Sequence, residues 1–161
     1  MTNRSQSTAK QGVGVGDIAP DFELCDQNGS PVRLSAWRGC KNVVLFFYPK
    51  ANSAGCTVEA CAFRDQYESF ADAGAVVVGI SMDPVDAQAA FAHRNRLPFT
   101  LLADPDGAAA RAYGVPNWMG VFRGRVTYVI DREGVIQHVF NSQIRLHDHV
   151  KAALKTLKRL S

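Results

Sequence analysis

Two cysteines, Cys56 and Cys61, lie where the sequence changes from a buried strand to a helix. Residues 43–48 form an unbroken apolar run closed by Pro49, which is typical of a central strand buried on both faces. From Cys56 to Phe70, apolar residues recur at helical spacing without a proline. We therefore expect Cys56 at a helix N-terminus, where backbone amides and the helix dipole favour an anion such as a thiolate.

Cysteine and histidine also bind metals, and the sequence gives little support for such a site. The spacing of Cys56 and Cys61 is not that of a zinc ribbon, and no second pair of ligands is visible. His147 and His149 lie two residues apart in an expected helix, so their side chains do not converge. We expect neither a metal nor a cofactor.

A wider motif surrounds Cys56. It reads Pro49-x3-Ser53-x2-Cys56 and continues as GCTVEACAFRD over residues 55–65. This pattern resembles the peroxiredoxins, and in particular the peroxiredoxin Q, or bacterioferritin-comigratory-protein, subfamily. The resemblance extends from residue 15 to the C-terminus, and further matching segments are 99–104, 113–115 and 124–131.

The resemblance implies a thiol peroxidase without haem, flavin or metal. Cys56 would attack hydrogen peroxide or an organic hydroperoxide and become a sulfenic acid, and Cys61 would condense with it to an intramolecular disulfide. Thioredoxin or a similar dithiol protein would then reduce the disulfide. Arg125, in the strand that matches the family's R-x-T/S-F/Y-x-I-D pattern, would favour the thiolate and bind a peroxide oxygen. The subfamily also implies a monomer.

Three further residues have both a functional and a structural interpretation. Pro49 would shield the sulfur from water, or simply ends the strand. Ser53, where the family more often has threonine, would place its hydroxyl against the thiolate or peroxide, or simply caps the helix. Glu59, one turn after Cys56, would orient Arg125 by a bidentate pair, or is solvated. Arg123 competes with Arg125 for its role.

Two other functions remain open beside the peroxidase. A thioredoxin-like disulfide reductase is disfavoured because such proteins use C-x-x-C, which this chain lacks. A peroxide sensor or holdase, in which oxidation only switches partner binding, would use the same Cys56 chemistry.

Composition limits the class of protein. With 161 residues and a net charge of +3, the chain fits one globular domain. Its basic residues gather only in the last helix, where we expect a solvated face and not a nucleic-acid site. No apolar run is long enough to span a membrane, and no signal or transit peptide is visible. We therefore expect a bacterial cytoplasm, with a plastid as the alternative, and expect Cys25 and Cys40 to be partly buried filler.

The order of elements predicts an α/β fold, and the resemblance implies the thioredoxin-like one: a mixed central sheet flanked by helices, with an N-terminal β-hairpin. Residues 1–14 are expected to form a flexible tail, and 15–161 a single domain. Gly74 should end the helix that starts at Cys56, and 114–124 should be a loop. Expected strands are 21–24, 32–34, 43–48, 75–81, 99–103, 125–130 and 135–140, and the other expected helices are 85–96, 108–113 and 146–160.

Overall fold

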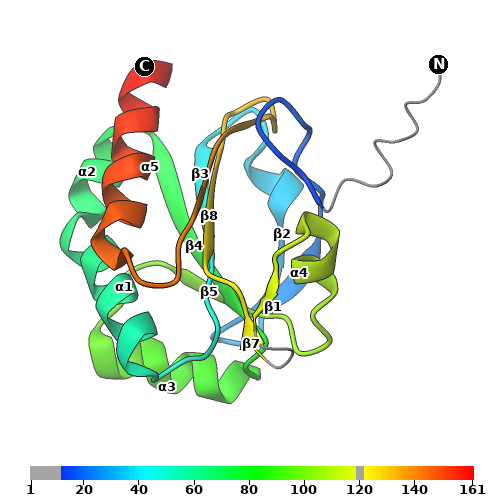
Figure 1. The fold of residues 1–161 in the computed structure, drawn as a ribbon, viewed down its shortest axis with the longest axis vertical. Helices are drawn as coiled ribbons and strands as arrows, with labels where there is room; N and C mark the ends of the chain where they lie inside the picture. The colour runs from blue at the N-terminus through cyan, green and yellow to red at the C-terminus, as the bar shows by residue number, and fades with distance from the viewer. Residues whose placement is uncertain (1–11, 119–121) are drawn as a thin grey trace.

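A seven-stranded mixed sheet lies at the centre of the molecule, which is described by a computed structural model over residues 12–118 and 122–161 (Figure 1). The strand order is β2-β1-β5-β4-β3-β8-β9. The expected mixed sheet flanked by helices is confirmed. The strands are β1 (Glu23–Asp26), β2 (Pro31–Arg33), β3 (Asn42–Phe47), β4 (Ala75–Ser81), β5 (Thr100–Ala103), β8 (Val126–Ile130) and β9 (Ile136–Asn141).

The central strand β3 explains the long apolar run. It pairs in parallel with β4 and antiparallel with β8, and all its residues are buried. Alternate side chains of a strand point to opposite faces of the sheet. Val44 and Phe46 accordingly pack into one hydrophobic core, while Leu45 and Phe47 pack into the other. Both faces must be apolar because both are covered.

Helices cover the two faces unequally (Figure 1). The helices α1, α2, α3 and α5 contribute to the core around Phe46, and α4 contributes to the core around Leu45. Cys56 belongs to the core around Phe46, so it lies on the more heavily covered face. The helical segments are the 3-10 turn η2 (Leu34–Trp37) and the helices α1 (Ala54–Asp65), α2 (Tyr67–Asp72), α3 (Val85–Asn95), α4 (Ala108–Tyr113) and α5 (Leu146–Leu160).

The N-terminal hairpin is confirmed and forms one edge of the sheet. Its strand β1 pairs antiparallel with both β2 and β5. The segment expected to be a loop at 114–124 contains a second, small pair of strands, β6 (Asn117–Trp118) and β7 (Phe122–Arg123). The amide of Gly124 donates to the carbonyl of Pro116 at 2.6 Å, which closes this segment just before β8.

The expected long helix after residue 56 is in fact two helices. The first, α1, begins at Ala54 and ends at Asp65, and Gln66 with φ −107° and ψ 15° separates it from α2. In one straight helix, Phe63 and Phe70 would be separated by about 10.5 Å along the axis. The turn at Gln66 brings their rings to 5.6 Å, so both enter the same core.

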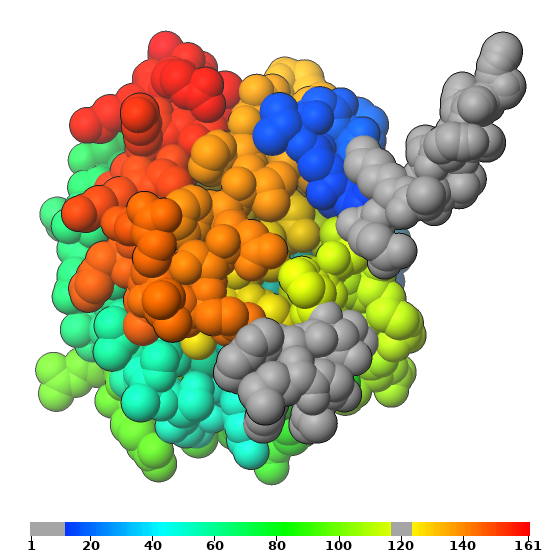
Figure 2. All heavy atoms as spheres, viewed as in Figure 1, coloured from blue at the N-terminus to red at the C-terminus, as the bar shows by residue number. Residues whose placement is uncertain are grey.

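Part of the expected N-terminal tail is bound to the domain. Residues 1–11 lie outside the described residues, but the amide of Val13 donates to the Tyr113 carbonyl at 3.3 Å. A Cβ on Gly12 would lie 2.3 Å from that carbonyl oxygen, so the close approach requires glycine. Gly16 donates to Ile136, and the segment lies against β9 (Figure 2). The contacts of residues 12–16 show that a polar, glycine-rich composition does not by itself indicate a free chain, while the tail over residues 1–11 stays a prediction.

Several side chains face differently from the sequence expectation. Val58 of α1 is 42% exposed, although it fits the apolar spacing of that helix. In α3 the polar Gln88 is buried while the apolar Ala90 is exposed, the reverse of what their residue types predict. Cys25 and Cys40 are exposed, so the expectation of partly buried filler was wrong. Cys25 lies at an exposed position of the short strand β1, and Cys40 lies in the exposed turn before β3.

Candidate functional site

The loop between β3 and α1 places Cys56 in the first turn of a helix. Asn52 takes a positive φ of 66°, a conformation that asparagine adopts more readily than most residues. Ser53 then occupies the N-cap position in an extended conformation, and the amide of Thr57 donates to its carbonyl at 2.9 Å. Cys56 follows as the third helical residue and is 1% exposed. Its sulfur therefore lies near the positive end of the helix dipole, as expected.

A buried polar network holds this loop in place. The Asp83 carboxylate accepts from the amide of Ala51 at 2.7 Å and from the hydroxyl of Ser81 at 2.6 Å. Gln88, fully buried on α3, donates to the Ser81 hydroxyl at 3.0 Å and accepts from the hydroxyl of Tyr48 at the end of β3. Three elements around the loop are thus linked by satisfied hydrogen bonds, which makes a buried polar network rigid.

Arg125 lies directly against the sulfur. Its Nη1 is 3.4 Å from the Cys56 Sγ and 2.7 Å from the Glu59 Oε1. Arg125 is 5% exposed and Glu59 is fully buried, so this ion pair is shielded from water. The expected contact between Glu59 and Arg125 is present, and a solvated Glu59 is excluded. The expected bidentate geometry is wrong, because only Oε1 contacts the guanidinium.

Burial dominates the electrostatics of this cluster. Desolvation raises the pKa of Glu59 to about 7, although the charge and hydrogen bond of Arg125 act in the opposite direction. Burial by itself would lower the pKa of Arg125, but the adjacent charges of Glu59 and Cys56 raise it overall. Arg125 therefore stays cationic, while Glu59 sits where its charge is poorly tolerated.

A residue that the sequence did not single out, His149 of α5, completes the cluster. Its Nδ1 lies 2.7 Å from the Thr127 hydroxyl and 3.5 Å from Oε2 of Glu59. Its Nε2 lies 2.9 Å from the Ser142 carbonyl. His149 is fully buried, and burial lowers its pKa to about 4, so it is neutral at pH 7. A histidine on the inward face of an amphipathic helix was the available signal, but it was considered only as a metal ligand.

Gly55 is a second residue of the site that sequence reasoning missed. A Cβ at this position would lie 3.1 Å from Nη2 of Arg125 and 3.9 Å from Cδ1 of Leu146. The glycine therefore allows the guanidinium to lie over the start of α1. Its place immediately before the cysteine was the only hint that the sequence offered.

Ser53 and Pro49 frame the sulfur less directly. The Ser53 hydroxyl donates to the carbonyl of Lys50 at 2.8 Å and makes no side-chain cap to α1. It therefore braces the loop, which contradicts the expectation that it caps the helix with its hydroxyl. Pro49 follows the fully buried Tyr48 and is itself partly exposed, at the point where the chain leaves β3.

The second cysteine of the motif lies further along the same helix and points toward α3. The Cys61 thiol is partly buried, and its Sγ lies 3.8 Å from Oδ1 of Asn95. Arg64 donates to the Asn95 carbonyl at 2.8 Å, which fixes the same end of α3 to α1. Both Cys56 and Cys61 are free thiols on an unbroken helix.

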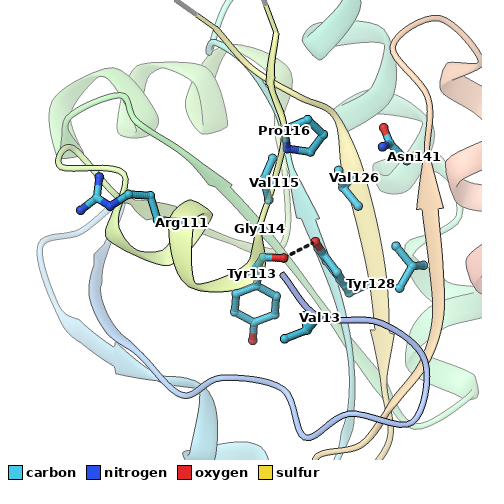
Figure 3. Close-up of a pocket in the computed structure, with 10 residues that line it drawn as sticks. Val13, Arg111, Tyr113, Gly114, Val115, Pro116, Val126, Tyr128 and Asn141 are labelled. Carbon is cyan, nitrogen blue, oxygen red and sulfur yellow. Dashed lines mark hydrogen bonds between the residues drawn. The ribbon is translucent and has the colours of Figure 1, made fainter. Parts of the chain in front are cut away.

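A pocket of about 700 Å³ lies on the other face of the sheet from this cluster (Figure 3). Val126 and Tyr128 of β8 line it, whereas Arg125 and Thr127 point toward α1 and α5. The Tyr128 hydroxyl donates to the Tyr113 carbonyl at the wall of the pocket. Because alternate residues of a strand face opposite sides, this pocket does not reach Cys56.

The described residues contain neither a cluster of metal ligands nor a membrane-spanning helix. No three Cys, His, Asp or Glu side chains of the described residues gather as metal ligands would. Within that same part of the chain, no helix has the length and apolar character needed to cross a membrane. The basic side chains of α5, from Lys151 to Arg159, are exposed.

Comparison with known proteins adds a family to this geometry. The AhpC/TSA family model matches residues 15–139. The protein named peroxiredoxin Q, chloroplastic, from Sedum lineare is 48% identical over 149 residues, which are 92% of this chain and 80% of the relative. The crystal structure of peroxidoxin BcpB from Mycobacterium tuberculosis superposes with a TM-score of 0.87 at 43% identity, covering 92% of this chain and 99% of that one.

A second solved structure is that of a protein with a stated activity. It is a bacterioferritin comigratory protein of Xanthomonas campestris, which has alkyl peroxide reduction activity. It superposes with a TM-score of 0.82 at 28% identity over 92% of this chain and 98% of its own. The cluster of cysteine, arginine and glutamate thus lies in a fold shared with these proteins.

Proposed function

From the premise that this chain belongs to the AhpC/TSA family and is a thiol-dependent peroxidase of the peroxiredoxin Q subfamily, we propose that Cys56 is the residue that attacks the peroxide. The observation that carries this assignment is the contact of 3.4 Å between Arg125 Nη1 and the Cys56 Sγ at a helix N-terminus. The disulfide reductase and the sensor or holdase are not favoured, since the relatives bear peroxiredoxin names.

In the first step, the Cys56 thiolate attacks one peroxide oxygen. An S–O bond forms, the O–O bond breaks, and the leaving oxygen takes up a proton as water or alcohol. Arg125 stabilises both the thiolate and the charge that develops on the leaving oxygen. Its Nε is buried and has no protein partner among the described residues, so this N–H group is available to a substrate oxygen. Glu59 orients the guanidinium through Oε1.

In the second step, Cys61 attacks the sulfenic acid, water leaves, and an intramolecular disulfide forms. A dithiol protein such as thioredoxin reduces this disulfide by exchange and returns both thiols. Cys61 is a free thiol on the same helix and is partly accessible, which supports its role in resolving the sulfenic acid of Cys56.

Pro49 and Ser53 assist the reaction through the loop. Pro49 covers the approach to the sulfur from the end of β3. The Ser53 hydroxyl donates to Lys50, so it presents a lone pair and not its proton to the site unless it rotates. We assign it the role of bracing the loop in the resting state, with contact to the peroxide after rotation.

The remaining assignments concern substrates and surroundings. Hydrogen peroxide and alkyl hydroperoxides are the proposed substrates, and the alkyl peroxide reduction activity of the Xanthomonas campestris protein supports the second class. We propose a monomer, to be checked by analytical ultracentrifugation. The bacterial cytoplasm expected from the sequence is not confirmed; the chloroplastic relative supports a plastid, and fractionation of source cells would distinguish them.

Peroxide consumption in the presence of thioredoxin, its reductase and NADPH tests the function. We expect sustained turnover in the wild type, none in Cys56→Ser, and nearly full turnover in Cys25→Ser and Cys40→Ser, whose thiols are exposed and outside the cluster. Turnover by Cys56→Ser would overturn the assignment. Loss of one equivalent of peroxide without further turnover would instead support the sensor.

A further inference from the structure

Behind the peroxide site, Oε2 of Glu59 and Nδ1 of His149 face each other without a hydrogen bond between them. Oε2 of Glu59 is fully buried and has no hydrogen-bond partner among the described residues. Nδ1 of His149 lies 3.5 Å from this oxygen. A buried carboxylate oxygen without a donor is costly, so this atom needs an explanation.

The tautomer of His149 supplies that explanation. The Ser142 carbonyl can only accept, so Nε2 of His149 carries the hydrogen that bridges their distance of 2.9 Å. In the neutral ring Nδ1 is then an acceptor with a single lone pair, for which the Thr127 hydroxyl at 2.7 Å and a proton on Oε2 of Glu59 at 3.5 Å compete. An ionised Glu59 would therefore turn Oε2, which has no donor among the described residues, toward a ring nitrogen that carries no hydrogen. A single proton between the two atoms removes this conflict.

We propose that Glu59 and His149 together hold one proton beside the reduced Cys56, and that His149 is a positioning residue for the peroxide reaction. In this state Glu59 is a neutral acid whose Oε2–H points at Nδ1 of His149. The proposal rests on the function assigned above to Cys56. It extends that function by giving a role to α5, through His149.

The charge balance of the site favours this arrangement. The charged or titratable groups facing the pair are Cys56 and Glu59 from α1, Arg125 before β8, and His149 from α5, with Asp148 of α5 acting from the surface. With a thiolate at Cys56, an ionised Glu59 would leave two negative charges against one arginine in a buried site. With Glu59 protonated, the charges of Cys56 and Arg125 balance.

The consequence for catalysis follows from Arg125. When Glu59 is neutral, the full charge of the guanidinium acts on the thiolate and on the peroxide oxygens. When Glu59 ionises, Arg125 is drawn toward the carboxylate. Burial raises the pKa of Glu59 to about 7, so this change falls near neutral pH. We expect sulfenate formation in the wild type, expressed per Cys56 thiolate, to slow by about fivefold or more as pH rises from 6 to 8.5.

The test measures both the proton and the rate. Infrared difference spectra of reduced minus peroxide-oxidised protein should contain a C=O band of a protonated carboxyl that disappears in Glu59→Gln. Rapid-quench labelling of the sulfenate across pH 5 to 9, expressed per Cys56 thiolate, should show an alkaline decline in the wild type. In Glu59→Gln this decline should vanish, because a neutral amide cannot ionise.

His149 is tested by a pair of substitutions and a control on the same helix. His149→Leu should shift the carboxyl band, and should slow sulfenate formation by about tenfold, because Glu59 loses its acceptor. His149→Gln, which keeps a polar group, should restore part of the rate. His147→Gln is the control, since His147 is exposed, and should match the wild type.

The outcomes separate this proposal from the function on which it rests. If Cys56 still forms a sulfenic acid but no carboxyl band depends on Glu59, the proton is not held there and the inference is wrong. It is also wrong if the alkaline decline survives in Glu59→Gln, or if His149→Leu behaves like His147→Gln. If Cys56 is not oxidised at all, the proposed function fails first.

Discussion

At the scale of single residues, the thiolate alone explains little of a fast peroxide reaction. An ordinary cysteine has a pKa near 8.5, so about 3% is thiolate at pH 7. Complete ionisation would therefore raise the rate by at most about thirtyfold, or about 2 kcal/mol of barrier. The remainder must come from groups that stabilise the breaking O–O bond, and Arg125 is the donor that the structure places at the sulfur.

Arg125→Met is therefore expected to slow sulfenate formation by well over about thirtyfold, even at a pH where the mutant thiol is fully ionised. The measurement is the single-turnover rate of sulfenate labelling at that pH. Arg111→Met, at an exposed arginine of α4, serves as the control. Recovery of the wild-type rate at high pH would show that Arg125 acts only by favouring the thiolate.

Gly55→Ala should separate stability from activity. An added Cβ lies 3.1 Å from Nη2 of Arg125, so the guanidinium must move by a few tenths of an ångström. We expect oxidation to slow by about tenfold, because small misplacements of catalytic groups are costly. Thermal stability should be equal or slightly higher, since alanine favours a helix over glycine.

Gly14→Ala is the matched control, because an added Cβ there meets no atom within 4 Å. Stopped-flow oxidation and thermal unfolding of both variants provide the comparison. A Gly55→Ala protein that reacts at the wild-type rate would show that the close approach of Arg125 has no catalytic consequence.

At the scale of elements, the proposed resolution of Cys56 by Cys61 would require α1 to change shape. Five residues along an α-helix rise by about 7.5 Å and rotate by about 140° net, which places the Cα atoms of Cys56 and Cys61 about 8.6 Å apart. A disulfide tolerates no more than about 7 Å. Cys61 must also leave Asn95 of α3, which its sulfur faces at 3.8 Å.

We therefore expect peroxide-treated protein to contain an intramolecular Cys56–Cys61 link and to exchange amide hydrogens faster over residues 55–64. The exchange of α5 is the internal control. In Cys61→Ser, the first turnover should keep its rate, and sulfenic or sulfinic Cys56 should then accumulate. A link without faster exchange in α1 would contradict the unwinding, and no link would contradict resolution by Cys61.

The sequence predicted those elements whose pattern is local. The bounds of β4, α4 and α5 agree with the expected residues, because a buried apolar run, a short glycine-bounded helix and an amphipathic stripe are complete within themselves. The break at Gln66 was not predictable in this way. It depends on Phe63 and Phe70 meeting in one core, which is a tertiary contact.

The same division applies to the site. Cys56, Arg125 and Glu59 were expected together, and the structure brings them together. His149 was missed because its partners, Glu59, Thr127 and Ser142, come from a different helix, a strand and a loop. A histidine on the apolar face of an amphipathic helix indicates that the side chain is buried. Its function depends on the residues that contact it in the folded protein.

At the scale of the whole molecule, the sheet and α5 close around one pair of titratable groups whose behaviour affects folding. Burial raises the pKa of Glu59 from 4.5 to about 7 and lowers that of His149 from 6.5 to about 4. Between about pH 4.5 and 6.5, the unfolded pair holds one proton, on histidine. The folded pair also holds one proton, on glutamate. Because the two states bind equal numbers of protons, this pair contributes almost no pH dependence of stability in that window.

Single substitutions should reveal the two opposing contributions. In His149→Gln only Glu59 remains, and its raised pKa means that its contribution to stability is present below about pH 4.5 and is lost as pH rises toward 7. In Glu59→Gln only His149 remains, and its lowered pKa makes stability increase as pH rises from about 4 to 6.5. Each change is at most on the order of 3 kcal/mol. The measurement is the free energy of unfolding in urea of each reduced protein at pH 4.5 and at pH 6.5. Subtracting the change seen in the wild type removes the titration of all other groups. Parallel slopes in the three proteins would show that folding does not transfer the proton from histidine to glutamate.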